Sequence, residues 1–255
     1  MEEIRAKKDQ MLSLNLSFVD RGYSFQICQV LEKPLVIYNY YDHDLQDKMI
    51  NNTNSIKIEN SNVWVQRLSY VGEVGYELYI NNSEAKLIFN KITDIGKKFN
   101  LSLCGAHAMD TLRMESGFLH WGHDISPEEN QLEAGLNFAI SFKKNYDFVG
   151  KQALLEIDKN KVKKKFIMLT LNNAKPGEPL ALHFEPIYID GKICGNTTSA
   201  NYSFNYNKNL LFGYVSTDLK VEQLLEKKIQ VEIDKVKYDA SLLLKPLKDP
   251  KIKLN

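Results

Sequence analysis

Alternating apolar and polar positions predict strands in the first third of the chain. Val63 and Val65 alternate with residues expected to point to the other face, Trp64 and Arg67 among them, and the pattern continues through "LSYVGEVGYELYI" (68–80). The two glycines of this stretch predict a tight turn over Gly72–Gly75, between two strands. A shorter apolar run at 35–38, directly after a proline, also predicts a strand.

The pattern then changes to helical spacing. Apolar residues recur every three or four positions from 85 to 95, with Ser83 expected to cap the start of this helix and Gly96 its end. A second helix is expected over 105–116, closed by Gly117. The front part of the chain therefore mixes strands and helices.

Three weaker patterns follow. Ser126 and Pro127, with acidic residues after them, predict the start of a short helix. The run within 137–149 predicts a return to strand, and 150–160 predicts a short amphipathic helix.

The last third of the chain contains short alternating runs separated by Pro-Gly and Asp-Gly turn signals. This pattern predicts a small all-β unit, either a barrel or a sandwich. Its clearest hairpin is "YIDGKI", with Asp190-Gly191 at the turn. The lysine cluster at 159–165 lacks interleaved aromatic residues, so we interpret it as a solvated connector, not a nucleic-acid patch.

Composition narrows the class of protein. The chain has 255 residues, 44% hydrophobic and 25% charged, and its 33 basic and 32 acidic residues leave a net charge of +1. Such a balanced chain has no global field for nucleic acid or an anionic membrane, and it has no apolar run of membrane-spanning length, so we expect neither partner. Three dispersed cysteines without a CxxC pair indicate reduced thiols and a cytoplasmic location: Cys28, Cys104 and Cys194.

The sequence contains few motifs of known catalytic or ligand-binding sites. No phosphate-binding loop, dinucleotide fingerprint or nucleophile elbow is present. The stretch "HWGHD" (120–124) could ligate a metal through its two histidines and aspartate. It lies in an expected loop without a further ligand at the usual spacing, so we expect a hydrogen-bonded loop and no metal.

Glu73 and Glu77 are the more informative pair. A bend at the glycines would bring both carboxylates to the mouth of one cavity. A carboxylate accepts two parallel N–H bonds, which suits a flat ligand with an amidine-like edge such as a 2-amino-4-oxo pyrimidine ring. The alternative is two surface glutamates at a hairpin, which composition alone favours because exposed glutamate is common.

Several motifs in order carry a family resemblance. They are "LSYVGEVGYELYI", "CGAHAMDTLRMESGFLHWGHDISPEENQLEAGLNFAI", "DFVGKQALL", "EPIYIDGKICGNTTSANYSFNYNKNLLFGYV" and "KPLKDP". Together they resemble the glycine cleavage T-protein (aminomethyltransferase) family from about Val63 to the C-terminus. The forms "HWGHDI" and "DFVGKQ" are most similar to the folate-binding C-terminal region of dimethylglycine and sarcosine dehydrogenases.

The resemblance implies an α+β architecture: a folate-binding domain over 1–158, incomplete at its N-terminus, then a C-terminal β-barrel over 159–255. It also implies binding of tetrahydrofolate and transfer to it of a one-carbon unit from an aminomethyl or iminium donor, forming methylenetetrahydrofolate. The partners that it implies are the folate, this amine-derived donor and an FAD-containing amine dehydrogenase chain.

The resemblance also implies roles for individual residues. Glu77 matches the carboxylate that grips the pterin, with Glu73 and Tyr70 as its neighbours. Trp121 and Asp124 fall in a loop resembling the family's channel-lining loop, and Tyr214, in "FGYV", matches a barrel motif with a structural role.

Three departures from the family pattern limit what function the resemblance implies. Met109 stands where the T-protein has an arginine that contacts folate; the dehydrogenase branch tends to be apolar there, so Met109 supports the resemblance to that branch. Lys248 stands where a tyrosine is common before Asp-Pro. Nothing in residues 1–60 matches the block that carries the family's proton-handling aspartate, so the catalytic residues stay unassigned.

Two alternatives to the transferase hypothesis follow. The chain would be a non-catalytic folate- or partner-binding remnant, or a subunit of a split amine dehydrogenase; without an FAD fingerprint it cannot itself oxidise an amine. The second alternative is a role like that of the related tRNA-modification and iron–sulfur assembly proteins, which carry a reactive cysteine motif. The equivalent stretch here, "KNYDFVGKQ" (144–152), has no cysteine, so the sequence argues against this role.

Overall fold

The structure is a computed structural model that divides into two compact units. It describes residues 12–19, 22–29, 53–66, 69–144, 147–157, 161–173 and 175–248. The first unit comprises Met1–Ser116 together with Lys248–Asn255, and the second comprises Gly117–Leu247. These units divide the chain at a different place from the predicted domain boundary between 158 and 159. The strand predicted at 35–38 lies outside the described residues.

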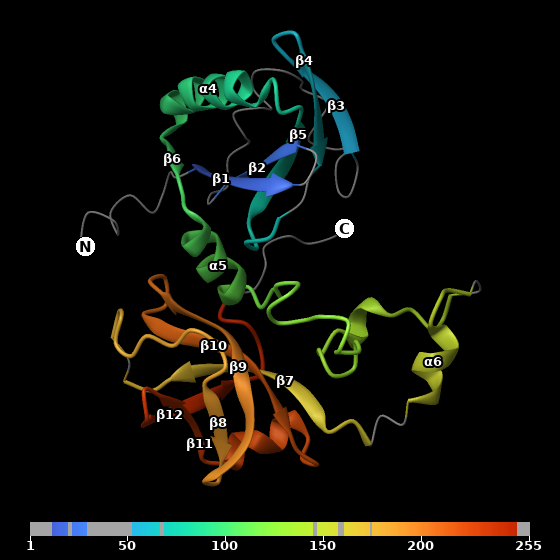
Figure 1. Ribbon diagram of the computed structural model, residues 1–255, viewed down its shortest axis with the longest axis vertical. Coiled ribbons are helices and arrows are strands. Elements are labelled where there is room, and N and C mark those ends of the chain that lie inside the picture. Colours follow the sequence, from blue (N-terminus) through green and yellow to red (C-terminus); the bar gives the residue numbers. More distant parts are fainter. Residues whose placement is uncertain are drawn as a thin grey trace. The chain divides into compact units, whose positions relative to one another are not determined.

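A six-stranded sheet forms the centre of the first unit (Figure 1). Its spatial order is β3-β4-β5-β2-β1-β6, with every neighbouring pair antiparallel except the parallel pair of β1 and β6. The strands are β1 (Leu12–Val19), β2 (Gly22–Gln29), β3 (Thr53–Ile58), β4 (Ser61–Gln66), β5 (Val74–Ile80) and β6 (Leu101–Leu103).

Helix α4 (Ala85–Gly96) supplies the apolar partner of this sheet. Alternate residues of β3, β4 and β5 are buried with α4 in one core: Ile56, Ile58, Val63, Val65, Tyr76, Leu78, Ile80, Ala85, Ile88 and Ile92. Because side chains alternate along a strand, the intervening residues of β4 and β5 lie on the opposite face of the sheet.

The two caps predicted for α4 are wrong. The N-cap is Glu84, whose side chain makes no capping hydrogen bond, and Gly96 is the last residue of the helix. A 3-10 turn, η1 (Lys97–Phe99), continues the chain until Asn100 adopts the left-handed conformation. Gly96 has an ordinary helical φ, but an added Cβ would overlap the side chain of Leu101. Close packing, not a left-handed turn, therefore requires glycine here.

The bend between β4 and β5 lies earlier in the chain than the predicted turn over Gly72–Gly75. Residues 70–73 form a bend in which Gly72 has a φ of 70°, whereas Gly75 lies inside β5 opposite Cys28. The Oγ of Ser69 accepts a hydrogen bond from the backbone N–H of Glu73 at 3.1 Å. The second predicted helix is confirmed as α5 (Ala106–Glu115).

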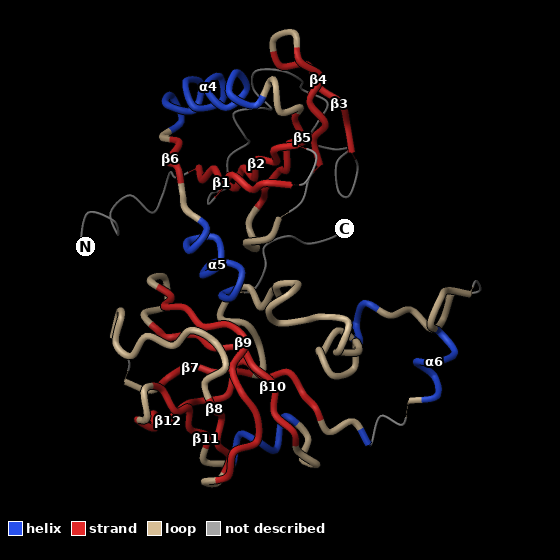
Figure 2. The backbone as a smooth tube through the Cα atoms, in the orientation of Figure 1, coloured by secondary structure: helices blue, strands red, loops and turns tan. Residues whose placement is uncertain are grey.

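The second unit contains a closed six-stranded barrel, so the barrel prediction is confirmed (Figure 2). Its order is β10-β7-β12-β11-β8-β9, and all neighbouring pairs are antiparallel. The strands are β7 (Lys164–Leu171), β8 (Pro186–Ile189), β9 (Lys192–Ser203), β10 (Lys208–Ser216), β11 (Ile229–Ile233) and β12 (Val236–Leu243), with a 3-10 segment η4 (Val221–Glu226) before β11.

The Asp190-Gly191 hairpin is also confirmed. It joins β8 to β9 with φ values of 48° and 80° at its two central residues. Two positive φ values in succession are the signature of a type I′ turn, which matches the right-handed twist of the flanking strands.

The segment between α5 and the barrel contains one confirmed and two wrong predictions. The helix predicted at 150–160 is confirmed over α6 (Lys151–Glu156), which has no buried residue, and residues 158–160 lie outside the described part of the chain. The helix predicted from Ser126 is a series of turns, and the strand predicted within 137–149 is a 3-10 turn, η2 (Asn137–Ala139). Among the described residues no strand pairs with residues 137–142, and Phe138 is 85% exposed. The alternating apolar residues of this segment therefore do not form part of a sheet.

Candidate functional site

Strand β5 directs Glu77 to the sheet face opposite α4. Tyr76 and Leu78 flank Glu77 in sequence and are buried in the core with α4. The alternation of side chains therefore places Glu77 and Tyr79 together on the other face, where the Glu77 side chain is half-buried. This is the location that a ligand-binding carboxylate needs, because the core side is closed by packed apolar residues.

The neighbouring strand β4 adds a polar and an aromatic group to this face. The register of β4 against β5 sets Gln66 opposite Glu77 and Trp64 opposite Tyr79. The rings of Trp64 and Tyr79 are in contact, with centroids 4.9 Å apart, and Trp64 is 47% exposed. We call these four residues, Trp64, Gln66, Glu77 and Tyr79, the Glu77 face.

One hydrogen bond orients the carboxylate. The Tyr79 hydroxyl donates to Oε2 of Glu77 at 2.7 Å. Burial, then the hydrogen bond to Glu77 and its negative charge, raise the pKa of Tyr79 to about 12. The phenol therefore stays protonated, and remains a donor, throughout the neutral pH range.

Glu73 has a different environment from Glu77. It is only 8% exposed and forms an ion pair with Lys248, the residue that departs from the tyrosine common in the family. The backbone N–H of Lys248 also donates to the carbonyl of Glu115 at 2.8 Å. The two glutamates of the predicted site therefore have separate partners, and the carboxylate of Glu73 is engaged inside the first unit.

Tyr70 and Trp121 are the other two predicted binding residues. Tyr70 is half-buried in the bend that precedes β5, and its role in binding stays a prediction. Trp121 belongs to the second unit, where its side chain is 65% exposed.

The loop around Trp121 is organised by Asp124. This carboxylate is 1% exposed and accepts hydrogen bonds from the backbone N–H of His120, at 2.9 Å, and from the hydroxyl of Thr198. The loop is thereby fixed to β9 of the barrel. Within the described part of the chain, no group of three or more histidine, cysteine or acidic side chains has an arrangement that would hold a metal ion.

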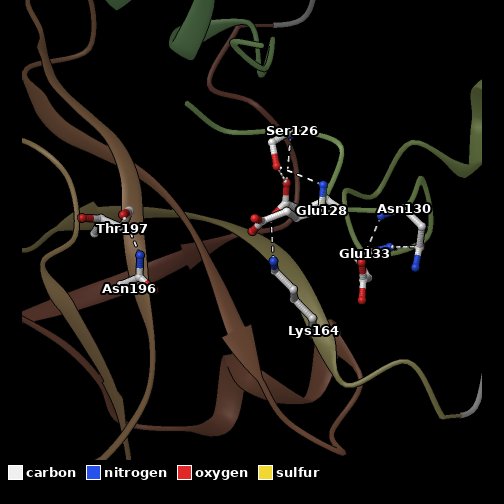
Figure 3. A network of polar contacts seen from close by, with 8 residues as sticks. Ser126, Glu128, Asn130, Glu133, Lys164, Asn196 and Thr197 are labelled. Carbon is white, nitrogen blue, oxygen red and sulfur yellow. Dashed lines mark hydrogen bonds and ion pairs between the residues drawn. The ribbon is translucent and has the colours of Figure 1, made fainter. Parts of the chain in front are cut away.

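A second polar network was not predicted from the sequence. Glu129 accepts from both the N–H and the hydroxyl of Ser126, at 2.8 and 2.7 Å, and from Nζ of Lys164 at 2.6 Å. Figure 3 shows Lys164 reaching from β7 toward the loop that carries Ser126, with Asn130 and Glu133 beside it. The signal that could have indicated it is the Ser-x-x-Glu spacing of Ser126 and Glu129, whereas we interpret Ser126 and Pro127 from the sequence as the start of a helix.

The electrostatics of Glu129 reflect two opposing effects. Burial by itself would raise its pKa, but the hydrogen bonds from Lys164 and Ser126 and the charge of Lys164 outweigh burial and lower the pKa below its ordinary value. The charged carboxylate is thus stabilised against the barrel.

Tyr214 lies on β10 beside this network. Its ring contacts Phe166 edge-on, and Nζ of Lys164 is 5.0 Å from the ring centroid. Its hydroxyl is buried without a hydrogen-bond partner among the described residues. Burial, and then the nearby carboxylates of Glu129, Asp124 and Glu133, raise the pKa of Tyr214. These contacts agree with the structural role expected for it.

Comparison with known proteins matches both parts of the chain to one family. Residues 36–144 match the GCVT N-terminal domain, and residues 164–249 match the Glycine cleavage T-protein C-terminal barrel domain. The human mitochondrial dimethylglycine dehydrogenase is 33% identical over 216 residues, which cover 83% of this chain and 24% of that protein. An aminomethyltransferase of Symbiobacterium thermophilum is 32% identical over 154 residues, covering 59% of this chain and 39% of that protein.

A solved structure supports the same fold. The crystal structure of the glycine cleavage system aminomethyltransferase T from Bartonella henselae aligns with a TM-score of 0.72 at 19% identity, covering 91% of this chain and 61% of that chain. The predicted T-protein-like fold with its C-terminal barrel is therefore confirmed. The chain spans about a quarter of the length of the dehydrogenase that it matches.

Proposed function

Because this chain belongs to the glycine cleavage T-protein family, we propose that it is a tetrahydrofolate-binding module for one-carbon transfer, with methylenetetrahydrofolate as the product. The observation that carries the proposal is the Glu77 face: a carboxylate on the open side of the sheet, oriented by Tyr79 and next to an exposed aromatic ring.

The chemistry of these residues fits a folate. The pterin presents an amino group and a ring N–H on one edge, and a carboxylate accepts such a pair of donors in parallel. Half-burial of Glu77 favours this recognition, because a charge-assisted hydrogen bond strengthens as water is excluded. Bound tetrahydrofolate would supply the amines that accept the one-carbon unit. The protein residues would bind and orient it, which lowers the entropic cost of reaction with an iminium donor.

A second candidate is folate binding without turnover. It is favoured by the absence of the family's proton-handling aspartate motif from residues 1–60. We propose an amine-derived iminium as the donor and an FAD-containing amine dehydrogenase chain as its supplier.

Binding is tested by calorimetric titration of the purified chain with tetrahydrofolate. We expect micromolar affinity in the wild type and at least a hundredfold weaker binding in Glu77→Ala, because a charged hydrogen-bonding partner of the pterin is lost.

Glu232→Ala is the matched control for this substitution. Glu232 accepts a hydrogen bond from the hydroxyl of Tyr188 at 2.7 Å, a pair like that of Glu77 and Tyr79 but located in the barrel. Equal affinity of wild type and Glu77→Ala would overturn the proposed site. Wild-type binding without formation of methylenetetrahydrofolate, when an iminium donor is added, would favour the second candidate.

A further inference from the structure

We infer that Tyr79 is a positioning residue for Glu77: its phenol holds Oε2 of the carboxylate and leaves Oε1 directed to the ligand, with Trp64 bracing the phenol ring. This inference rests on the proposed function and assigns roles to Tyr79 and Trp64, for which the resemblance implied none.

The geometry of the strand makes this arrangement possible. Residues two positions apart lie on the same face of a strand, about 7 Å apart along it. A tyrosine is long enough for its hydroxyl to return to the carboxylate of such a neighbour, and the observed distance of 2.7 Å is that of a good O–H···O bond. Among the residues whose side chains the structure describes, Tyr79 is the one that donates a hydrogen bond to Glu77, and this bond occupies Oε2.

The ring of Tyr79 also contacts the side chain of Trp64. Trp64 lies directly opposite Tyr79 on β4, and the two rings are tilted by 43° with their centroids 4.9 Å apart. Contact with an indole limits the rotamers of the phenol, so the hydroxyl stays near the carboxylate. The exposed part of Trp64 is then an aromatic surface next to the oriented acceptor.

Orientation before binding has a consequence for affinity. A free glutamate side chain loses rotamer freedom when it grips a ligand, which weakens binding. A carboxylate already held by an intramolecular donor loses less. Because the phenol remains protonated at neutral pH, it is a donor to the carboxylate in both the free and the bound protein.

The test is Tyr79→Phe in the whole chain. The substitution keeps the ring that contacts Trp64 and removes only the hydroxyl. We expect the dissociation constant for tetrahydrofolate to rise about three- to tenfold, the range that one hydrogen bond typically contributes. Binding of p-aminobenzoylglutamate, the folate fragment without the pterin, is expected to be unchanged if it binds, since Tyr79 acts through the pterin-binding carboxylate.

The barrel again offers a matched control. Tyr188→Phe removes an equivalent hydroxyl from the pair of Tyr188 and Glu232, so it is expected to leave folate affinity unchanged. An unchanged dissociation constant in Tyr79→Phe would overturn the inference, as would an equal loss of affinity for both folate and the fragment.

A titration without ligand separates failure of the inference from failure of the proposed function. Tyrosinate absorbance at 295 nm, taken as the difference between the parent protein and its Tyr79→Phe variant, follows the ionisation of Tyr79. We expect Glu77→Gln to shift this ionisation to lower pH and Glu232→Gln to leave it in place. No shift would mean that the two side chains are not coupled. If Glu77→Gln shifts the ionisation as expected but the wild-type chain does not bind folate, the proposed function is overturned, and the positioning role with it.

Discussion

At the scale of single residues, two glutamates four positions apart have different environments because of one bend and one strand. Glu77 lies within β5, where strand parity turns it away from the core, whereas Glu73 precedes the strand and pairs with Lys248. Gly72 makes the bend possible, since its φ of 70° is in the left-handed region that other residues adopt at a cost.

Substitution of Gly72 tests this dependence. We expect Gly72→Ala to lower the free energy of unfolding by about 2 to 3 kcal/mol, because the added Cβ is strained at positive φ and also overlaps Oγ of Ser116. Urea denaturation measures the change.

Gly135→Ala is the control for strain without overlap. Gly135 has a similar φ of 72°, but an added Cβ would meet nothing within 4 Å. We expect a loss of about 1 kcal/mol, the cost of strain alone. Equal losses at the two positions would show that the overlap with Ser116 is relieved at no cost.

At the scale of elements, the loop from Ser126 to Glu133 has the residue spacing of a helix start without the helix. The carboxylate of Glu129 satisfies the N–H and hydroxyl of Ser126, as in a capping box, but its other oxygen accepts from Lys164 of β7. The carbonyl of Glu133 accepts a further bond from the N–H of Phe166 at 2.8 Å. Contacts to a barrel strand thus replace the hydrogen bonds that a helix would have formed.

This attachment predicts a pH dependence. Glu129 has a lowered pKa in the folded protein, so its charged form contributes stability above the unfolded value of 4.5, and that contribution is lost as the pH falls through the lower folded value. We expect Lys164→Met to destabilise the protein at pH 6 and the difference from wild type to shrink as the pH falls below about 4.5. Urea unfolding between pH 3 and pH 6 measures both effects.

Lys163→Met is the neighbouring control. Lys163 and Asp218 form an ion pair in which both side chains are well exposed, so solvent screens it and little stability depends on it. A pH-dependent loss as large as that of Lys164→Met would indicate a general charge effect instead of the contact with Glu129.

At the scale of the whole molecule, the chain leaves the first unit after Ser116 and rejoins it at Lys248. The ion pair of Lys248 with Glu73 joins residues 175 positions apart, and both side chains are nearly buried. None of the described helices has the length and apolar character needed to cross a bilayer.

Removal of one partner of this pair is expected to weaken the first unit selectively. Lys248→Met leaves Glu73 buried without its cation, which typically costs about 3 kcal/mol. The two tryptophans of the chain allow separate readouts, since Trp64 lies in the first unit and Trp121 in the second.

Unfolding would therefore be followed by fluorescence in two backgrounds, Trp121→Phe and Trp64→Phe. We expect Lys248→Met to lower the urea midpoint reported by Trp64 and to leave that reported by Trp121 in place. A fall of both midpoints by the same amount would show that the two units unfold together.

The local pattern of residues determined the parts of this protein that depend on near neighbours in the chain. The Asp190-Gly191 turn, α4, α5, α6 and the alternating strands of the barrel follow from backbone preferences and apolar spacing over a few residues. Motifs in a fixed order along the chain likewise indicated the family and singled out Glu77 by its place within one of them.

Only the tertiary structure decided which distant residues meet. It paired Glu73 with Lys248 and Glu129 with Lys164, set Trp64 against Tyr79, and required a glycine at 96 through contact with Leu101. It also left the apolar alternation of 137–149 without a strand partner among the described residues. The reason is physical: an ion pair or a ring contact depends on the distance between two side chains in space. Packing across a sheet or barrel sets this distance, and the residues next to either partner in the sequence do not determine it.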